Sequence, residues 1–241
     1  MNGDAIKYNQ LRGWISCKSN IYSSIECLSP FDLTFHEGCV YGLRGPIGSG
    51  NWGLAKAISN LNLGRVYCEQ IIYKNNIIDF YEANSMVCDI DRYIENIITD
   101  NYTVKELIQR HISKSNKKIS EEDVAESFHL TAERYERRVT EVGNEIFRIA
   151  MAIGFIDGKV IFTFPFIGET EAIIVETTKC CYEFLKSNRI IIIIPYDRST
   201  KLNFSLDFEY SFSKSMLISV KHKTSFVMTI RSIHEFIKTH L

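Results

Sequence analysis

The stretch GPIGSGNWG, residues 45–53, joins two apolar segments of different character. The run 40–43 before it favours a strand, and residues 54–61 after it repeat apolar side chains with the spacing of one helix face. A strand, a glycine-rich loop and a helix in this order form a cradle for phosphate, because backbone N–H groups and the helix N-terminus point at one anion while glycines let the backbone come close. The stretch therefore predicts a loop of the phosphate-binding type.

Two positions depart from the phosphate-loop pattern G-x-x-x-x-G-K-[ST]. Gly45 and Gly50 have the required spacing, but Asn51 replaces the lysine that reaches the phosphates, and Trp52 replaces the hydroxyl that holds Mg²⁺. A simple tight turn is the alternative explanation of the glycines. The candidate phosphate-contacting residues are Gly45, Gly48, Ser49, Gly50, Asn51 and Trp52.

Composition excludes several classes of protein. The 241 residues are 45% hydrophobic, which is enough for a large core, and 28 Lys and Arg against 29 Asp and Glu leave a net charge of −1. No long run of one charge indicates nucleic-acid or membrane-surface binding. The seven cysteines show no C-x-x-C spacing and are expected to be reduced thiols. We expect no signal peptide, and the aliphatic run 190–194 is too short to span a bilayer.

The first third of the chain is predicted to be rich in strands. Alternating or continuous apolar residues separated by turn signals support this prediction. The expected strands are residues 14–17, 32–35 and 39–43, with turns at Ser29-Pro30 and Glu37-Gly38, followed by a hairpin of 65–73 and 77–81 around Asn75-Asn76.

The middle of the chain, from about residue 100 to 145, is predicted to be helical. Thr103 and Glu106 form a capping box for a helix over 104–112, and Ser120 with Asp123 marks the start of another. This segment is a candidate inserted lobe, and a further helix is expected over about 145–155.

Two short apolar runs follow, and each ends at a proline. Residues 160–164 and 190–194 flank a predicted helix over about 170–186, which is typical of buried parallel strands joined by a crossover. The tail is expected to contain strands near 216–220 and 225–230 and a short helix near His234.

From residue 22 to residue 197, the order of these parts resembles the nucleotide-binding subunit of an ATP-binding cassette (ABC) transporter. Residues 39–46, CVYGLRGP, are similar to the family's G-E-x-x-G-L-x-G-P, and residues 102–107, YTVKEL, are similar to its L-T-V-x-E-N. Tyr22 lies where the family has an aromatic residue that stacks on adenine, although a packed surface aromatic is the alternative.

The resemblance implies an α/β fold with three parts. These are a P-loop NTPase-like core with a parallel sheet, an N-terminal antiparallel β subdomain and an inserted α-helical lobe. We expect residues 1–241 to form a single domain, with the core at about 1–99 and 146–241 and the lobe at about 100–145.

The same resemblance shows that the family's reactive positions are substituted. Thr163 and Phe164 stand where the family has its Mg²⁺-linked aspartate and catalytic glutamate, and Tyr196 stands at its switch histidine. The signature loop L-S-G-G-Q maps to residues 141–145, where only Gly143 is retained, together with the following Arg148; no glutamine occurs in the Q-loop segment 89–92. We therefore assign no catalytic residue and no metal ligand, and we expect ATP binding to be weak at best, without Mg²⁺.

Three functions remain open. The first is a degenerate, hydrolysis-incompetent cassette subunit on the cytoplasmic side of the cell membrane, held there by a permease and paired with a second cassette, homologous or identical. The second is a soluble regulatory or scaffold pseudo-ATPase that binds its partner through the lobe. The third is an ATPase with substituted residues. For the first two, the changes Asn51→Lys and Trp52→Ser are expected to raise nucleotide affinity without restoring hydrolysis.

Overall fold

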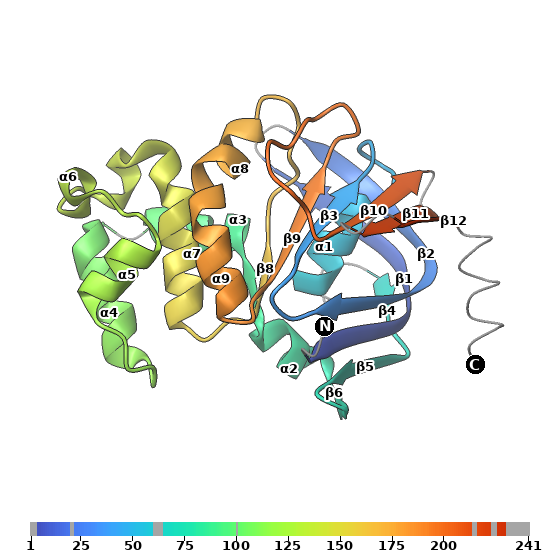
Figure 1. The fold of residues 1–241 in the computed structure, drawn as a ribbon, viewed down its shortest axis with the longest axis horizontal. Coiled ribbons are helices and arrows are strands. Elements are labelled where there is room, and N and C mark those ends of the chain that lie inside the picture. The colour runs from blue at the N-terminus through green and yellow to red at the C-terminus, as the bar shows by residue number, and fades with distance from the viewer. Residues whose placement is uncertain are drawn as a thin grey trace.

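The computed structural model describes residues 4–19, 22–59, 65–99, 101–213, 216–222 and 226–229, and it has three parts side by side (Figure 1). A helical lobe lies at one end, an antiparallel sheet lies at the other end, and a second sheet extends from the middle of the molecule to the antiparallel sheet. The strands are β1 (Ala5–Lys18), β2 (Ser23–His36), β3 (Val40–Arg44), β4 (Arg65–Tyr67), β5 (Gln70–Tyr73), β6 (Asn76–Ile78), β7 (Val87–Asp89), β8 (Ile161–Thr163), β9 (Ile191–Tyr196), β10 (Phe208–Ser213), β11 (Met216–His222) and β12 (Phe226–Thr229).

The helices divide between the core and the lobe. The α-helices are α1 (Asn51–Ser59), α2 (Phe80–Ser85), α3 (Ile90–Thr99), α4 (Val104–Lys114), α5 (Glu121–Ser127), α6 (Ala132–Tyr135), α7 (Ile146–Ile156), α8 (Ala172–Thr178) and α9 (Tyr182–Ser187). Three short 3-10 turns are η1 (Val139–Glu141), η2 (Gly143–Glu145) and η3 (Lys179–Cys181).

The first sheet confirms the predicted antiparallel subdomain. Its order is β2-β1-β5-β6, and β4 also pairs with β1. The predicted turn at Ser29-Pro30 is wrong, because β2 continues through both residues. Pro30 is tolerated there because β2 is the last strand of the path and its pairing with β1 shifts register between Leu11 and Gly13.

The second sheet confirms the predicted parallel core. Its order is β12-β11-β10-β3-β9-β8-β7, and the strands from β10 to β7 run parallel to one another. The apolar runs at 160–164 and 190–194 supply the neighbouring strands β8 and β9, as expected, although β9 continues through Pro195. Because parallel strands are buried on both faces, every residue of β8 and β9 is buried.

Several predicted boundaries move. Helix α1 begins at Asn51 rather than at Leu54, and Leu61 lies outside the described residues. The helix predicted over 170–186 is divided into α8, η3 and α9. The hairpin turn falls at Lys74 and Asn75, both with positive φ, and the chain enters α2 where a strand was expected. The helix expected near His234 lies outside the described part of the chain.

The lobe is formed by α4, α5 and α6; the predicted capping box of α4 is present, and Ser120 caps α5 as predicted, there too in a capping box with Asp123. Thr103 Oγ1 accepts a 3.2 Å hydrogen bond from the Glu106 N–H, and Ser120 Oγ accepts a 3.0 Å bond from the Asp123 N–H. Helix α7 lies between this lobe and strands β8 and β9 (Figure 1). Eight of its eleven residues are buried, so α7 joins the lobe to the core through one hydrophobic cluster.

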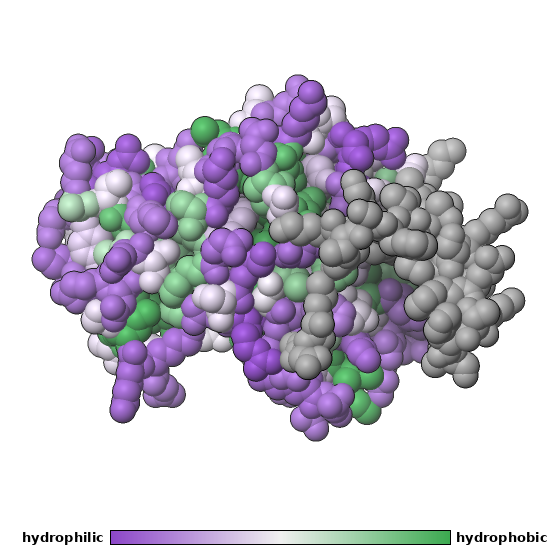
Figure 2. Space-filling model, in the orientation of Figure 1, coloured by the Kyte–Doolittle hydropathy of each residue, from purple (hydrophilic) through white to green (hydrophobic). Residues whose placement is uncertain are grey.

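The visible surface is largely hydrophilic, with hydrophobic residues in small separate groups (Figure 2). Among the described residues, no helix is both long enough and apolar enough to cross a membrane.

Candidate functional site at residues 45–53

The predicted loop lies between the end of β3 and the start of α1, at the carboxyl edge of the parallel sheet. The Gly45 N–H donates to the Tyr196 carbonyl of the neighbouring strand at 3.0 Å, which anchors the entry to the loop. Gly48 and Gly50 adopt φ angles of +86° and +96°, which other residues rarely adopt, so the loop needs glycine at both positions. The strand, loop and helix thus occur in the predicted order.

The Asn51 side chain is fully buried inside the loop. Its Nδ2 atom lies 3.0 Å from the carbonyl oxygens of Leu43 and Gly45 and 3.1 Å from that of Tyr196, while its Oδ1 atom accepts a 3.1 Å bond from Ser49 Oγ. The amide therefore ties two strands and the loop together. It is a neutral structural link at the position where the phosphate-loop pattern has a lysine.

A carboxylate occupies the cradle that the loop forms. Glu26, from β2, is 0% exposed, and its Oε1 and Oε2 atoms accept hydrogen bonds of 2.6 Å each from the N–H groups of Gly48 and Gly50. These are the backbone donors that such a loop offers to an anion. Glu26 is not among the site residues predicted from the sequence. The available signal was strand alternation, which places Glu26 on the inward face with Leu28.

Trp52 is a core residue. Its indole is 0% exposed and lies 5.7 Å from the Phe166 ring, centroid to centroid. Its Nε1 atom has no hydrogen-bond partner among the described residues. Because the ring fills the core beneath the first turn of α1, this position offers nothing to a metal ion.

Tyr22 is connected to Trp52 through Phe166. The Tyr22 ring meets Phe166 edge-on with centroids 5.5 Å apart, and its hydroxyl donates to Glu171 Oε2 at 3.3 Å. Burial and the nearby Glu171 carboxylate raise the pKa of Tyr22. The structure therefore brings Tyr22 to the same end of the sheet as the loop and gives it a packing role.

The two positions at the end of β8, Thr163 and Phe164, provide no acid. Thr163 is buried, and its Oγ1 atom has no hydrogen-bond partner in the described parts of the chain. Phe164 is also buried and packs edge-on against Tyr182, with centroids 5.9 Å apart. Within the described ranges, no group of three His, Cys, Asp or Glu residues is arranged to hold a metal ion.

Lys56, which follows the loop in α1, is already paired. Lys56, one turn into α1, places its Nζ 3.1 Å from carboxylate oxygens of both Asp89 and Asp91. Burial alone would lower the pKa of Lys56, but the two carboxylates more than offset this effect and raise it. Lys56 therefore serves the ion pair that joins α1 to the end of β7, and it does not replace the missing lysine.

The segment aligned with the signature loop, residues 141–145, is fixed by contacts with neighbouring residues of the lobe and of α7. Gly143 has a φ of +58° and open space around it, whereas Val142 is buried. Glu145 accepts a 2.6 Å hydrogen bond from the Thr131 N–H, and Arg148 lies 3.8 Å from the same carboxylate. Arg148 thus packs the lobe.

Tyr196, which is aligned with the switch histidine, is buried, and its side chain is bound to a carboxylate. Its hydroxyl donates to Glu209, and burial followed by this carboxylate raises the pKa of Tyr196. The backbone carbonyl of Tyr196 supports the loop, as described above.

These residues do not fit ATP with Mg²⁺. A nucleotide phosphate requires the N–H donors that Glu26 holds, and a magnesium ion requires oxygen ligands that Trp52 and Phe164 cannot supply.

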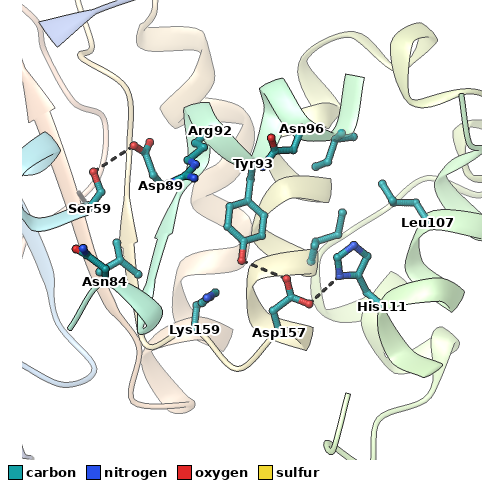
Figure 3. A pocket seen from close by; sticks show the side chains of 13 residues that line it. Ser59, Asn84, Asp89, Arg92, Tyr93, Asn96, Leu107, His111, Asp157 and Lys159 are labelled. Atoms are coloured by element: carbon teal, nitrogen blue, oxygen red, sulfur yellow. Dashed lines mark hydrogen bonds and ion pairs between the residues drawn. The ribbon is translucent and has the colours of Figure 1, made fainter. Parts of the chain in front are cut away.

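A cavity of about 550 Å³ opens between α3, α4 and α7 (Figure 3). Tyr93 of α3 and His111 of α4 both turn toward Asp157, which follows α7, at 3.1 Å and 2.7 Å. These contacts connect the lobe to the core at one end of the cavity. The remaining lining residues are Ser59, Asn84, Val87, Asp89, Arg92, Asn96, Ile97, Leu107, Ile153 and Lys159.

No protein-family model matches the sequence, and no curated protein matches it. Solved structures do match. They include cbiO1 from Clostridium perfringens, part of the ABC transporter complex cbiONQ, with 14% identity, a TM-score of 0.63, and coverage of 97% of this chain and 96% of that one.

Two further cassettes agree with this similarity. A nucleotide-free ATP-binding cassette from an ABC transporter has 13% identity, a TM-score of 0.62 and coverage of 98% and 95% of the two chains. The dimeric cassette MJ0796, bound to ADP and phosphate, has 14% identity, a TM-score of 0.61 and coverage of 92% and 100%. This chain therefore has the fold of the ATP-binding cassettes of ABC transporters.

Proposed function

We propose that this chain is a cassette subunit of a membrane ABC transporter that does not hydrolyse ATP. It pairs with a second cassette, homologous or identical, and with a permease, and it structures or regulates transport. The proposal is supported by similarity along nearly the whole chain to cbiO1, which is part of a transporter complex, and to MJ0796, which is a dimer. In this proposal residues 1–241 form one cassette domain, with its lobe at about 100–145 and its core on either side.

The proposed loss of hydrolysis rests on the two side chains at the end of β8, neither of which is an acid. Phosphoryl transfer depends on positioned metal ions and charged groups. At the two positions that the resemblance assigns to acids, Thr163 has a buried hydroxyl and Phe164 is packed against Tyr182. Neither side chain can hold Mg²⁺ or orient an attacking water. We infer that the residual loop, with Tyr22 nearby, binds nucleotide weakly at best.

The cavity between α3, α4 and α7 is the proposed permease site. Its floor contains the buried apolar residues Ile97, Leu107 and Ile153, and exposed polar residues Arg92 and Asn96 of α3 lie at its rim. An apolar floor with a polar rim suits an amphipathic helix from a partner. The permease would hold the subunit on the cytoplasmic face of the cell membrane.

A soluble regulatory or scaffold protein is the second candidate. The observation that favours it is that charged residues line the cavity wall in addition to the polar rim. These residues are Asp89, Asp157 and Lys159. A wall of this kind also suits a water-soluble partner.

The decisive experiment is a pull-down of the tagged chain from detergent-solubilised membranes, with the bound chains identified by mass spectrometry. Recovery of a multi-span permease supports the transporter proposal, and recovery of soluble proteins alone supports the second candidate. The recovered complex is then assayed for magnesium-dependent ATP turnover. Turnover that disappears when this chain alone is changed at Thr163 or Phe164 would show it to be an ATPase.

A further inference from the structure

Glu26 is bound to the loop as a phosphate group would be. The loop presents two N–H groups, from Gly48 and Gly50, and each donates to a different oxygen of one carboxylate at 2.6 Å. The positive φ angles of both glycines turn these N–H groups toward the same point. The Glu26 side chain is 0% exposed, so bulk solvent does not reach the carboxylate or the two N–H groups that it accepts from.

The first turn of α1 is built to admit the Glu26 side chain. A Cβ atom placed on Gly53 would lie 2.4 Å from Glu26 Cβ and 3.0 Å from Ile15 Cγ2. Only glycine leaves room for the stem of Glu26 at this point. The absence of a side chain at position 53 and the carboxylate at position 26 therefore belong to one arrangement.

We propose that Glu26 is a built-in ligand of the phosphate-type loop, which takes the place of a nucleotide phosphate and keeps the loop closed to nucleotides. This inference deepens the proposed function and rests on it for the origin of the loop as a nucleotide site. A tethered carboxylate has an effective concentration that a free anion in solution cannot match. Asn51 adds no positive charge that would favour the free anion.

The proposal predicts that removing the carboxylate creates an anion site. In Glu26→Ala the two loop N–H groups lose their acceptor, and an unpaired buried donor is costly. Inorganic phosphate can then supply the missing oxygens. Because the phosphate would form charge-assisted hydrogen bonds with the two loop N–H groups, its apparent affinity for Glu26→Ala should be roughly tenfold or more higher than for the unchanged chain.

The test uses the full-length chain and two readouts. The first is the melting temperature in increasing inorganic phosphate, and separately in ATP without magnesium, each against sodium chloride of equal ionic strength. The second is the fluorescence of Trp52, which follows Asn51 directly, in a Trp14→Phe background that leaves one tryptophan. Glu141→Ala serves as the control, because it removes the same charge from an exposed position.

The expected result is a saturable rise in melting temperature and a change in Trp52 fluorescence for Glu26→Ala, with no such response in the unchanged chain or in Glu141→Ala. An equal response in all three proteins, or none in a folded Glu26→Ala, would overturn the proposal. If Glu26→Ala does not fold, Glu26→Gln keeps the side-chain volume and must show the same direction of change. Neither readout involves a partner chain, so this test and the pull-down can fail independently.

Discussion

The Gly50 N–H, immediately before helix α1, donates a hydrogen bond of 2.6 Å to Glu26 Oε2, an atom of the antiparallel sheet. This bond connects the N-terminal subdomain to the loop of the parallel core. Anion binding by such a loop depends on the backbone, so it survives when the lysine and hydroxyl of the pattern are absent. The loop in this chain has this backbone geometry, and its N–H groups bind Glu26 and so join the two sheets.

Replacement of the two tryptophans should have very different effects on stability. Trp52 is 0% exposed, whereas Trp14 is 57% exposed on β1. Trp52→Ala is expected to lower the free energy of unfolding by about 3–5 kcal/mol, because it leaves a large cavity. Trp14→Ala should cost much less, and urea unfolding of both variants measures the difference. Equal losses would contradict the position of Trp52 in the core.

A lysine at position 51 should not by itself produce nucleotide binding. The sequence suggested that restoring the pattern residues would raise nucleotide affinity, but Glu26 already holds the loop N–H groups. Asn51→Lys would also bring a cation near this carboxylate and favour an internal ion pair. Titration with a fluorescent nucleotide should therefore show no gain for Asn51→Lys.

The matched variant adds one change. Asn51→Lys combined with Glu26→Ala frees the loop N–H groups and leaves the new ammonium for a phosphate, so nucleotide affinity should rise well above that of either single variant. Equal binding by Asn51→Lys and the double variant would show that Glu26 does not limit access to the loop.

Local sequence signals predicted much of the fold. The capping residues Thr103 and Ser120 begin α4 and α5, because a cap depends on residues three positions apart. The apolar run at 190–194 predicted the buried strand β9, because a short continuous apolar run is itself a local signal of a strand buried on both faces. Pro30 was misread, because its place in an edge strand depends on which strands are neighbours.

The candidate site was only partly predictable. The loop could be recognised from the spacing of Gly45 and Gly50, whereas its ligand is separated from it by 22 residues at Gly48 and 24 at Gly50. A charged residue in an alternating strand is usually solvated, and only the pairing of two distant segments shows that Glu26 has a buried partner. Strand alternation places Glu26 on the inward face, but no local signal identifies the loop N–H groups as its partners.

The thiols should differ strongly in reactivity. Cys180 is exposed, whereas Cys17 and Cys88 are buried. Burial, followed by the nearby Glu26 carboxylate, raises the pKa of Cys17 to about 12, and burial raises the pKa of Cys88 well above its ordinary value. At pH 8 these two thiols are almost entirely protonated and should react slowly with a disulfide reagent, because the thiolate is the nucleophile.

The measurement follows labelling of the native and the unfolded chain by mass spectrometry. Cys180 should be labelled first, and unfolding should expose all seven thiols. Raising the pH toward 12 forms the Cys17 thiolate, but the labelling rate rises only if the reagent can reach this buried residue. A faster labelling of Cys17 at high pH in a chain that is still folded would therefore show that the structure opens locally around it. Rapid labelling of Cys88 in the native chain at pH 8 would contradict its burial.

Filling the cavity at α3 should abolish permease binding if that cavity is the docking site. Asn96 is exposed on α3 and lines the cavity, so Asn96→Trp adds a large side chain at its mouth with little expected effect on the core. Asn76→Trp is the matched control, because it adds the same side chain at the exposed start of β6, which does not line the cavity. Both variants should keep the melting temperature of the unchanged chain, and only Asn96→Trp should lose the permease in the pull-down.

Retention of the permease by a folded Asn96→Trp would place the docking surface elsewhere on the chain. If both variants lose the permease, an added tryptophan interferes with binding at either position. The result would then give no support to the cavity as the docking site.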